Sequence, residues 1–294
     1  MTYTLLVRAE GGVWVALSDQ GGAYAEAADA IRNELHRSGV GGRLVIRPWR
    51  ELPVGTSPAI VVSVGVGALR GIAESDIKAP VLATLVPRAA YLRLADGAGR
   101  ASPRPMSAVW LDQPFSRQFG LLRLALPARH RVGTLLGSES RLFEQELQRA
   151  SAERNLELAT VRVDAGDQLP TAVQGVLEDT DVLLALPDPQ VFNGATIQNI
   201  LTAAYRRRVP LVGFSPAYVK AGAMLALYST PTQMGVQVAD VVRAVLAGRP
   251  MPPPQGPRTF TIGINADVAR SLGITIEEDA AARWTERLAR EKGS

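Results

Sequence analysis

The chain has 294 residues, of which 47% are hydrophobic and 20% charged, and its formal net charge is +4 at pH 7. It contains no cysteine and two histidines, His36 and His130. These counts exclude disulfides, thiolate metal sites and cysteine nucleophiles, and they leave little room for histidine chemistry. No stretch approaches the roughly 18 apolar residues of a membrane span, so we expect none. The remaining composition is that of a globular protein with one large core or two medium ones.

The first part of the chain alternates apolar runs with helical patterns. A helix is predicted over Tyr24–Arg37, and a short helix follows the glycine-rich turn after Val64. The polar stretch 95–107, "ADGAGRASPRPMS", predicts a loop, and residues 2–8 predict an additional edge strand. Strands are predicted over Val13–Leu17, Arg43–Arg47, Ala59–Val64, Val81–Val86 and Ala108–Leu111.

The alternation then restarts and continues almost to the end. Strands are predicted over Arg131–Leu136, Leu158–Val163, Val182–Leu186, Leu211–Phe214, Ala223–Tyr228 and Thr259–Ile264. Helices are predicted over Gln113–Leu126, Leu142–Arg154, Leu169–Leu177, Thr196–Arg207, Pro231–Leu246, Asp267–Leu272 and Glu278–Arg290. The proline-rich stretch "GRPMPPPQGPR" predicts a linker.

Strands separated by helices indicate βαβ units and parallel sheets, and strands that are apolar throughout indicate helices on both faces. The fold class is therefore α/β, with two doubly wound parallel-sheet lobes. The first lobe spans 1–111, and 229–256 return to it. The second spans 112–228, and 257–294 pack either at a hinge or on this lobe.

In open α/β sheets, ligands bind outside the carboxyl ends of the strands. The residues that follow the predicted strands are hydroxyls, amides, carboxylates and aromatics, which suit a small polar molecule with a flat part. Each alone is also an ordinary helix cap or turn residue. The candidate ligand-binding residues are Ser18, Asp19, Gln20, Gly65, Thr84, Asp112, Ser138, Asp188, Asn193, Phe214, Ser215, Tyr218 and Tyr228.

Motifs for catalysis are incomplete. "GVGALRG", Gly65–Gly71, is one residue from the dinucleotide fingerprint and lacks an acidic residue after the next strand. "GFSPA", Gly213–Ala217, is similar to a nucleophile elbow, but both histidines precede Ser215. Neither histidine has a metal ligand at helical spacing. The basic cluster Arg206–Arg208 reads as a solvated helix end rather than a nucleic-acid surface. We therefore expect no enzyme, no cofactor, no metal and no nucleic-acid partner.

Four stretches give the chain a family resemblance. A helix ending in "LALP" precedes "RVGTLL", and "PLVGFS" precedes "VKAGAMLALY". "VLAGRPMPP" forms a helix end and linker, and "FTIGINADVARSLGITI" closes the fold. The chain resembles the periplasmic substrate-binding proteins of ABC importers, in the tryptophan/tyrosine-binding branch of the type I fold. The match is long over 105–280 and looser in the first lobe.

The resemblance implies two α/β lobes, a hinge of crossing segments and a ligand enclosed between the lobes. It also implies an ABC permease as partner, a periplasmic location and a monomer. Members often place Asp-Pro where this chain has Pro87-Arg88, and Asp-Asn where it has Asp188-Pro189. Arg88 therefore joins the candidate ligand-binding residues, and both an amino acid and a carboxylate stay open. The alternatives are a sensory module without a permease and a nucleotide-dependent enzyme.

Overall fold

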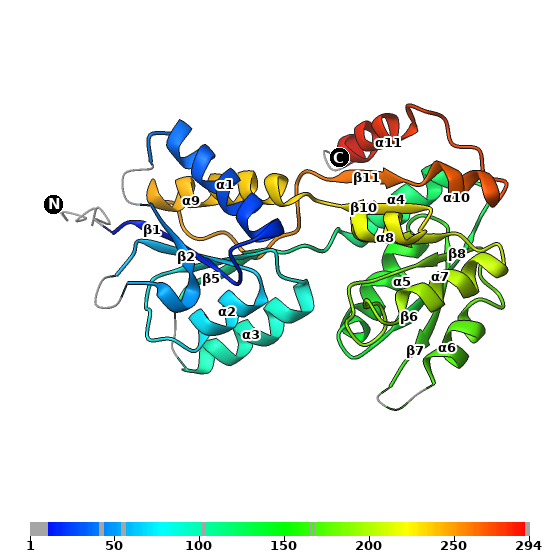
Figure 1. The fold of residues 1–294 in the computed structure, drawn as a ribbon, viewed down its shortest axis with the longest axis horizontal. Helices are drawn as coiled ribbons and strands as arrows, with labels where there is room; N and C mark the ends of the chain where they lie inside the picture. Colours follow the sequence, from blue (N-terminus) through cyan, green and yellow to red (C-terminus); the bar gives the residue numbers. More distant parts are fainter. Residues whose placement is uncertain are drawn as a thin grey trace. The chain divides into compact units, whose positions relative to one another are not determined.

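The computed structural model in Figure 1 describes residues 11–40, 44–53, 57–101, 104–164, 166 and 168–291. The predicted edge strand at residues 2–8 lies outside them. The chain divides into two compact units. The first comprises Met1–Leu111 and Thr230–Thr259, and the second comprises Asp112–Ser229 and Phe260–Ser294. The chain therefore passes from one unit to the other at 111–112, 229–230 and 259–260.

The first unit contains a five-stranded parallel sheet in the order β2-β1-β3-β4-β5. Residues of β1 and β3 are buried along their whole length because helices cover both faces of the sheet. The strands are β1 (Val13–Leu17), β2 (Leu44–Pro48), β3 (Ile60–Val64), β4 (Val81–Thr84) and β5 (Met106–Val109). The helices are α1 (Gly22–Arg37), η2 (Trp49–Glu51), α2 (Val66–Ala73), α3 (Arg88–Ala101) and α9 (Pro231–Leu246).

Two cores lie on the two faces of this sheet. On one face, residues of α1 and α9 pack on Val15, Val62 and Leu82, among others. On the other face, residues of α2 and α3 pack on the opposite side chains of the same strands. Figure 1 shows α9, the returning segment, lying beside α1. This close packing requires Gly235, whose added Cβ would stand 2.6 Å from the Ala27 carbonyl oxygen.

The predicted loop at 95–107 is partly wrong. Helix α3 runs through Ala101, and no helix had been predicted between Val86 and Ala108. The buried side chains of Ala90 and Tyr91 explain the difference, because they pack into the core beside α2. Each glycine inside a helix costs only about 1 kcal/mol, which tertiary packing offsets.

The second unit contains a six-stranded sheet in the order β11-β10-β9-β8-β6-β7. Only β11 runs antiparallel to its neighbour. The strands are β6 (Arg131–Leu136), β7 (Glu157–Arg162), β8 (Val182–Leu184), β9 (Leu211–Gly213), β10 (Leu225–Tyr228) and β11 (Thr261–Ile264). The helices are α4 (Phe115–Ala125), η3 (Ser140–Phe143), α5 (Glu144–Ala152), α6 (Leu169–Val176), α7 (Ile197–Arg206), α8 (Pro216–Ala221), α10 (Ala266–Ser271) and α11 (Ala280–Arg290).

Residues of α6, α7 and α8 form one core of this unit with β8 and β9. Elsewhere in the unit, α11 packs on α4, since Leu288 lies against Gly120. Glu291, after α11, also forms an ion pair of 2.7 Å with Arg154, after α5. Both units thus have the predicted α/β class.

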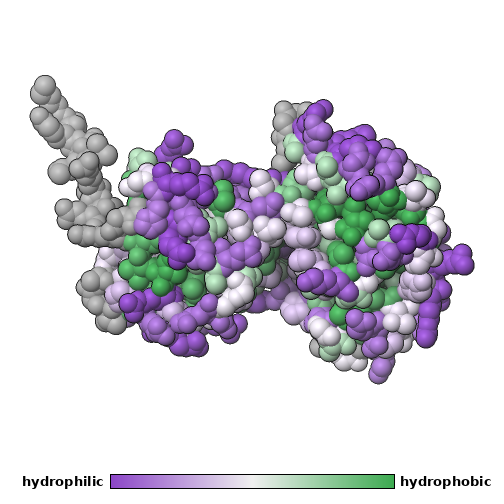
Figure 2. Space-filling model, turned by 45° about the horizontal axis from the view of Figure 1, so that its top comes forward, coloured by the Kyte–Doolittle hydropathy of each residue, from purple (hydrophilic) through white to green (hydrophobic). Residues whose placement is uncertain are grey.

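The surface drawn in Figure 2 is mostly hydrophilic, with smaller apolar patches on each unit. Among the described residues, no helix is both long enough and apolar enough to cross a membrane.

Candidate functional site

The carboxyl ends of the strands in the first unit meet at one edge. The register pairs Leu17 with Val64, Val64 with Thr84, and Thr84 with Val109. The segments that follow these strands therefore begin side by side, as expected for a ligand site in a parallel sheet.

Ser18 and Gly65 lie together at this edge. The Ser18 hydroxyl accepts a hydrogen bond of 2.8 Å from the Ala68 N–H, at the start of α2. Gly65 has a φ of 90°, and an added Cβ would lie 2.6 Å from both the Ser18 hydroxyl oxygen and the Tyr24 ring. A side chain at Gly65 would therefore be strained and obstructed. One N–H group of the "GVGALRG" helix start is thus already bonded to Ser18.

Asp19 and Gln20 are exposed on the same loop. Asp19 Oδ1 accepts a hydrogen bond of 3.2 Å from the Gly21 N–H, before the first residue of α1. Thr84, in contrast, is fully buried, and its hydroxyl has no hydrogen-bond partner among the described residues. Its side chain therefore lies inside the unit rather than on its surface.

Arg88 begins α3 just after β4, and it lies with Trp110 at the end of β5. The Arg88 guanidinium carbon is 5.2 Å from the centroid of the Trp110 ring. The Tyr91 and Trp110 ring centroids are 6.4 Å apart. Trp110 was not among the predicted site residues, because the last strand of the first lobe was predicted to extend to Leu111. An aromatic residue directly after a shorter strand was the signal that could have identified it.

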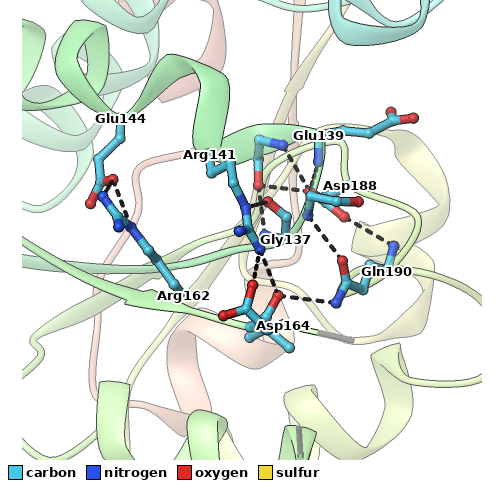
Figure 3. A network of polar contacts seen from close by, with 11 residues as sticks. Gly137, Glu139, Arg141, Glu144, Arg162, Asp164, Asp188 and Gln190 are labelled. Atoms are coloured by element: carbon cyan, nitrogen blue, oxygen red, sulfur yellow. Dashed lines mark hydrogen bonds and ion pairs between the residues drawn. The ribbon is translucent and has the colours of Figure 1, made fainter. Parts of the chain in front are cut away.

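In the second unit, Asp188 lies at the centre of a polar network that joins the loops after β6 and β8 (Figure 3). It is 1% exposed. Its Oδ2 accepts hydrogen bonds from the Glu139 N–H at 3.1 Å, and from the Ser140 N–H and hydroxyl, both at 2.8 Å. Its Oδ1 accepts a bond of 3.0 Å from the Gln190 N–H. The carboxylate is thus used to hold the two loops together.

The approach of these loops also depends on Gly137, because an added Cβ there would stand 2.4 Å from Asp188 Oδ1. Ser138 is exposed, and its N–H donates to Gln190 Oε1 at 3.0 Å. Arg141 is paired with Asp164 at 2.6 Å, close to the same network (Figure 3).

Asn193 follows in the β8–α7 loop and closes its own turn. Its Oδ1 accepts hydrogen bonds from the Ala195 and Thr196 N–H groups, at 2.9 and 3.2 Å. Its amide donates to the Pro189 carbonyl at 2.9 Å. The side chain therefore shapes this loop.

Phe214, Ser215 and Tyr218 follow β9. Tyr218 is 8% exposed and packs on Gly213, so it belongs to the core, and burial raises the pKa of its hydroxyl. Its ring centroid is 4.5 Å from that of Phe214, which is only partly buried. Ser215 caps α8 by position, without a side-chain hydrogen bond. Of the two aromatic rings, Phe214 exposes more surface.

Asp112 and Tyr228 lie at the two ends of the second unit's first segment, and both are partly buried. Next to them, Gln113 donates from its Nε2 to the Ser229 hydroxyl at 2.8 Å. Arg117 is buried, donates to Gln113 Oε1, and lies 4.3 Å from the Phe260 ring centroid. Burial lowers the pKa of Arg117 to about 10. Within the second unit, the contacts of this cluster join residues that lie beside each of the three chain crossings.

For catalysis or metal binding, the described residues offer no group of three or more histidines or carboxylates that could hold a metal ion. His130 precedes β6, at the amino end of that strand, where its Nδ1 is 3.1 Å from Arg123 Nη1. The predicted site residues, which do not include His130, lie at or beyond the opposite, carboxyl ends of their strands.

Comparison with solved structures shows the type I periplasmic binding protein fold. A Streptococcus pneumonia ABC domain in complex with L-Trp aligns with a TM-score of 0.64 and 18% identity, covering 92% of this chain and 97% of that chain. The ligand-free, open structure of a substrate binding protein with adhesive properties from Clostridium difficile aligns with a TM-score of 0.71 and 12% identity, covering 92% and 97%. An Agrobacterium vitis solute binding protein with alpha-D-tagatopyranose aligns with a TM-score of 0.52 and 14% identity, covering 94% and 99%.

No curated protein sequence matches the chain. The family described as ABC transporter substrate binding protein matches residues 51–287, which is most of the chain. This chain belongs to the family of ABC transporter substrate binding proteins.

Proposed function

We propose that this protein captures a small polar or aromatic molecule, an amino acid or a carboxylate, between its two units, and delivers it to an ABC permease. The single observation that supports this most is the division into two α/β units joined by three chain crossings. Each unit carries loops at the carboxyl ends of its parallel strands, so each can contribute half of a ligand site. Closure about the crossings would then enclose the ligand.

The predicted ligand contacts differ in what they can do. Asp188, Asn193, Thr84 and Tyr218 are buried or bonded within the protein, so we propose that they shape the loops. The candidates that present surface to a ligand are then Ser18, Asp19, Gln20, Arg88, Asp112, Ser138, Phe214, Ser215 and Tyr228, whereas Gly65 is buried.

The protein is proposed to act by binding alone, as a monomer in the periplasm. Structures of this fold have been solved with L-Trp and with alpha-D-tagatopyranose, so the fold itself does not choose between an amino acid and a sugar. The choice depends on the side chains at the loop ends.

The test is native mass spectrometry of the purified protein, followed by thermal shift against amino acids, aromatic and aliphatic carboxylates, sugars and nucleotides. We expect one small molecule per chain and a rise in the unfolding temperature of several degrees with one of the first two classes. A response to nucleotides alone would contradict the proposal and support an enzyme. No response to any class would also contradict it.

A further inference from the structure

Arg88 occupies an unusual position for a cation. It is the first residue of α3, where the helix dipole favours negative charge, and the first turn of α3 holds no acidic residue. Arg88 also follows β4 at the carboxyl edge of the sheet, so it adds positive charge where the first unit would receive a ligand. A cation here disfavours the helix and favours an anion nearby.

The indole of Trp110 holds this guanidinium. The Arg88 guanidinium carbon lies over the Trp110 ring, 5.2 Å from its centroid, and both side chains are partly buried. The backbone at Trp110 is fixed, since the Trp110 backbone N–H donates to the Gln255 carbonyl at 3.1 Å and the following Leu111 backbone N–H donates to the Val86 carbonyl at 3.0 Å. Tyr91 packs on the indole from the next turn of α3. Arg88 therefore lies on a rigid aromatic support.

The indole covers one side of the Arg88 guanidinium, so a ligand meets the guanidinium from another side. An arginine carries its N–H donors in a planar fork. Those donors match the two oxygens of a carboxylate, and partial burial strengthens the interaction relative to water.

In the second unit, the most deeply buried carboxylate near the strand ends does not need a positively charged ligand group as a partner. Asp188 already accepts four hydrogen bonds from the protein and is 1% exposed. A ligand therefore gains nothing at Asp188 by carrying an ammonium group.

We propose that Arg88, supported by Trp110, is the receptor for a carboxylate group on the ligand, and that the ligand needs no ammonium group. This inference rests on the proposed function and narrows its ligand class. It makes Arg88 a specificity-determining residue and Trp110 its positioning residue.

The test is isothermal titration calorimetry with matched probes: 3-phenylpropionate, indole-3-propionate and hexanoate, each beside its neutral amide, with phenethylamine, L-phenylalanine and L-tryptophan. We expect at least one acid to bind about 10- to 100-fold more tightly than its amide, the range for a charge-assisted bidentate contact. We also expect that acid to bind at least as tightly as the corresponding amino acid, where the panel contains one.

Variants separate the role of Arg88 from a general effect on charge or folding. In Arg88→Gln, the dissociation constants of the acid and its amide should lie within about twofold of each other. Arg88→Lys should keep an intermediate preference for the acid, because lysine retains the charge but lacks the planar pair of N–H donors. Trp110→Leu should weaken binding of the acid more than binding of the amide.

The matched control is Arg50→Gln. Arg50 also stacks on a tryptophan, at 4.4 Å from the Trp49 ring. However, this pair lines a cavity of about 570 Å³ with Ser57 and Lys78, and none of the residues that line this cavity is a candidate ligand-binding residue. The control should leave the acid preference unchanged.

The outcomes distinguish the inference from the proposed function. Equal binding of acids and amides, or an acid preference that survives Arg88→Gln, would overturn the inference and leave the proposed function standing. Failure of every amino acid and carboxylate to bind, with or without binding of amines or sugars, would overturn both.

Discussion

Replacing Asp188 with asparagine tests whether a buried carboxylate holds the two loops of the second unit. An asparagine can keep a carbonyl oxygen at the position of Oδ2, but its amide group then faces the Gln190 N–H, so donor meets donor. The variant loses that hydrogen bond and also the charge that strengthens the bonds from Glu139 and Ser140. One hydrogen bond to a charged group is worth about 1.5–3 kcal/mol, so we expect a loss of about 3 kcal/mol.

The assay is urea unfolding followed by circular dichroism, with thermal unfolding as a second measurement. For units of this size, a loss of about 3 kcal/mol lowers the unfolding temperature by about 6–12 °C. Asp164→Asn is the matched control, because it removes a carboxylate in the same network (Figure 3) whose side chain is 65% exposed. It should cost less than about 1 kcal/mol. If Asp188→Asn falls within about 0.5 kcal/mol of this control, the reasoning about the buried carboxylate is wrong.

Two further changes test packing and burial in the first unit. Gly235→Ala should destabilise the protein by about 1–3 kcal/mol in urea unfolding, since its Cβ would meet the Ala27 carbonyl, whereas Gly175→Ala in α6, with nothing within 4 Å, should be neutral or stabilising. Equal effects of the two would contradict the close packing of α9 on α1. Burial raises the pKa of Tyr91 to about 12, so the folded state keeps a proton that the unfolded state releases above about pH 10, and stability falls as the pH rises. Between pH 8 and pH 12, the free energy of unfolding should therefore fall by about 2 kcal/mol less in Tyr91→Phe than in the unaltered protein. An equal fall in the two proteins would refute this.

The element pattern was largely predictable because strands covered on both faces are apolar throughout and helices between them are amphipathic. Compared with the structure, the predicted ends of the strands and helices differ by at most two residues. The exceptions are η2, α2, η3 and α8, for which no bounds were predicted, and α3, where Gly97 and the prolines after it favoured a loop. The packing of Ala90 and Tyr91 decided that segment, and a local pattern does not contain such long-range contacts.

The candidate site was less predictable for the same reason. The position of Asp188 after a strand indicates a ligand contact, but Glu139 and Ser140, which donate three of its four hydrogen bonds, lie about 50 residues away and meet it only after folding. Tyr218 was predicted as a ligand-binding residue, yet Gly213 leaves room for its ring to pack into the core. A two-residue shift of β5 moves Trp110 from a strand interior to the strand end.

The central claim is that the two units close on a ligand. The most direct measurement is small-angle X-ray scattering of the protein with and without one saturating equivalent of the ligand that calorimetry identifies. The account predicts a smaller radius of gyration in the bound state, with the same ligand recovered chemically unchanged. Saturated binding with an unchanged radius of gyration would contradict closure, and a converted ligand would contradict binding without catalysis.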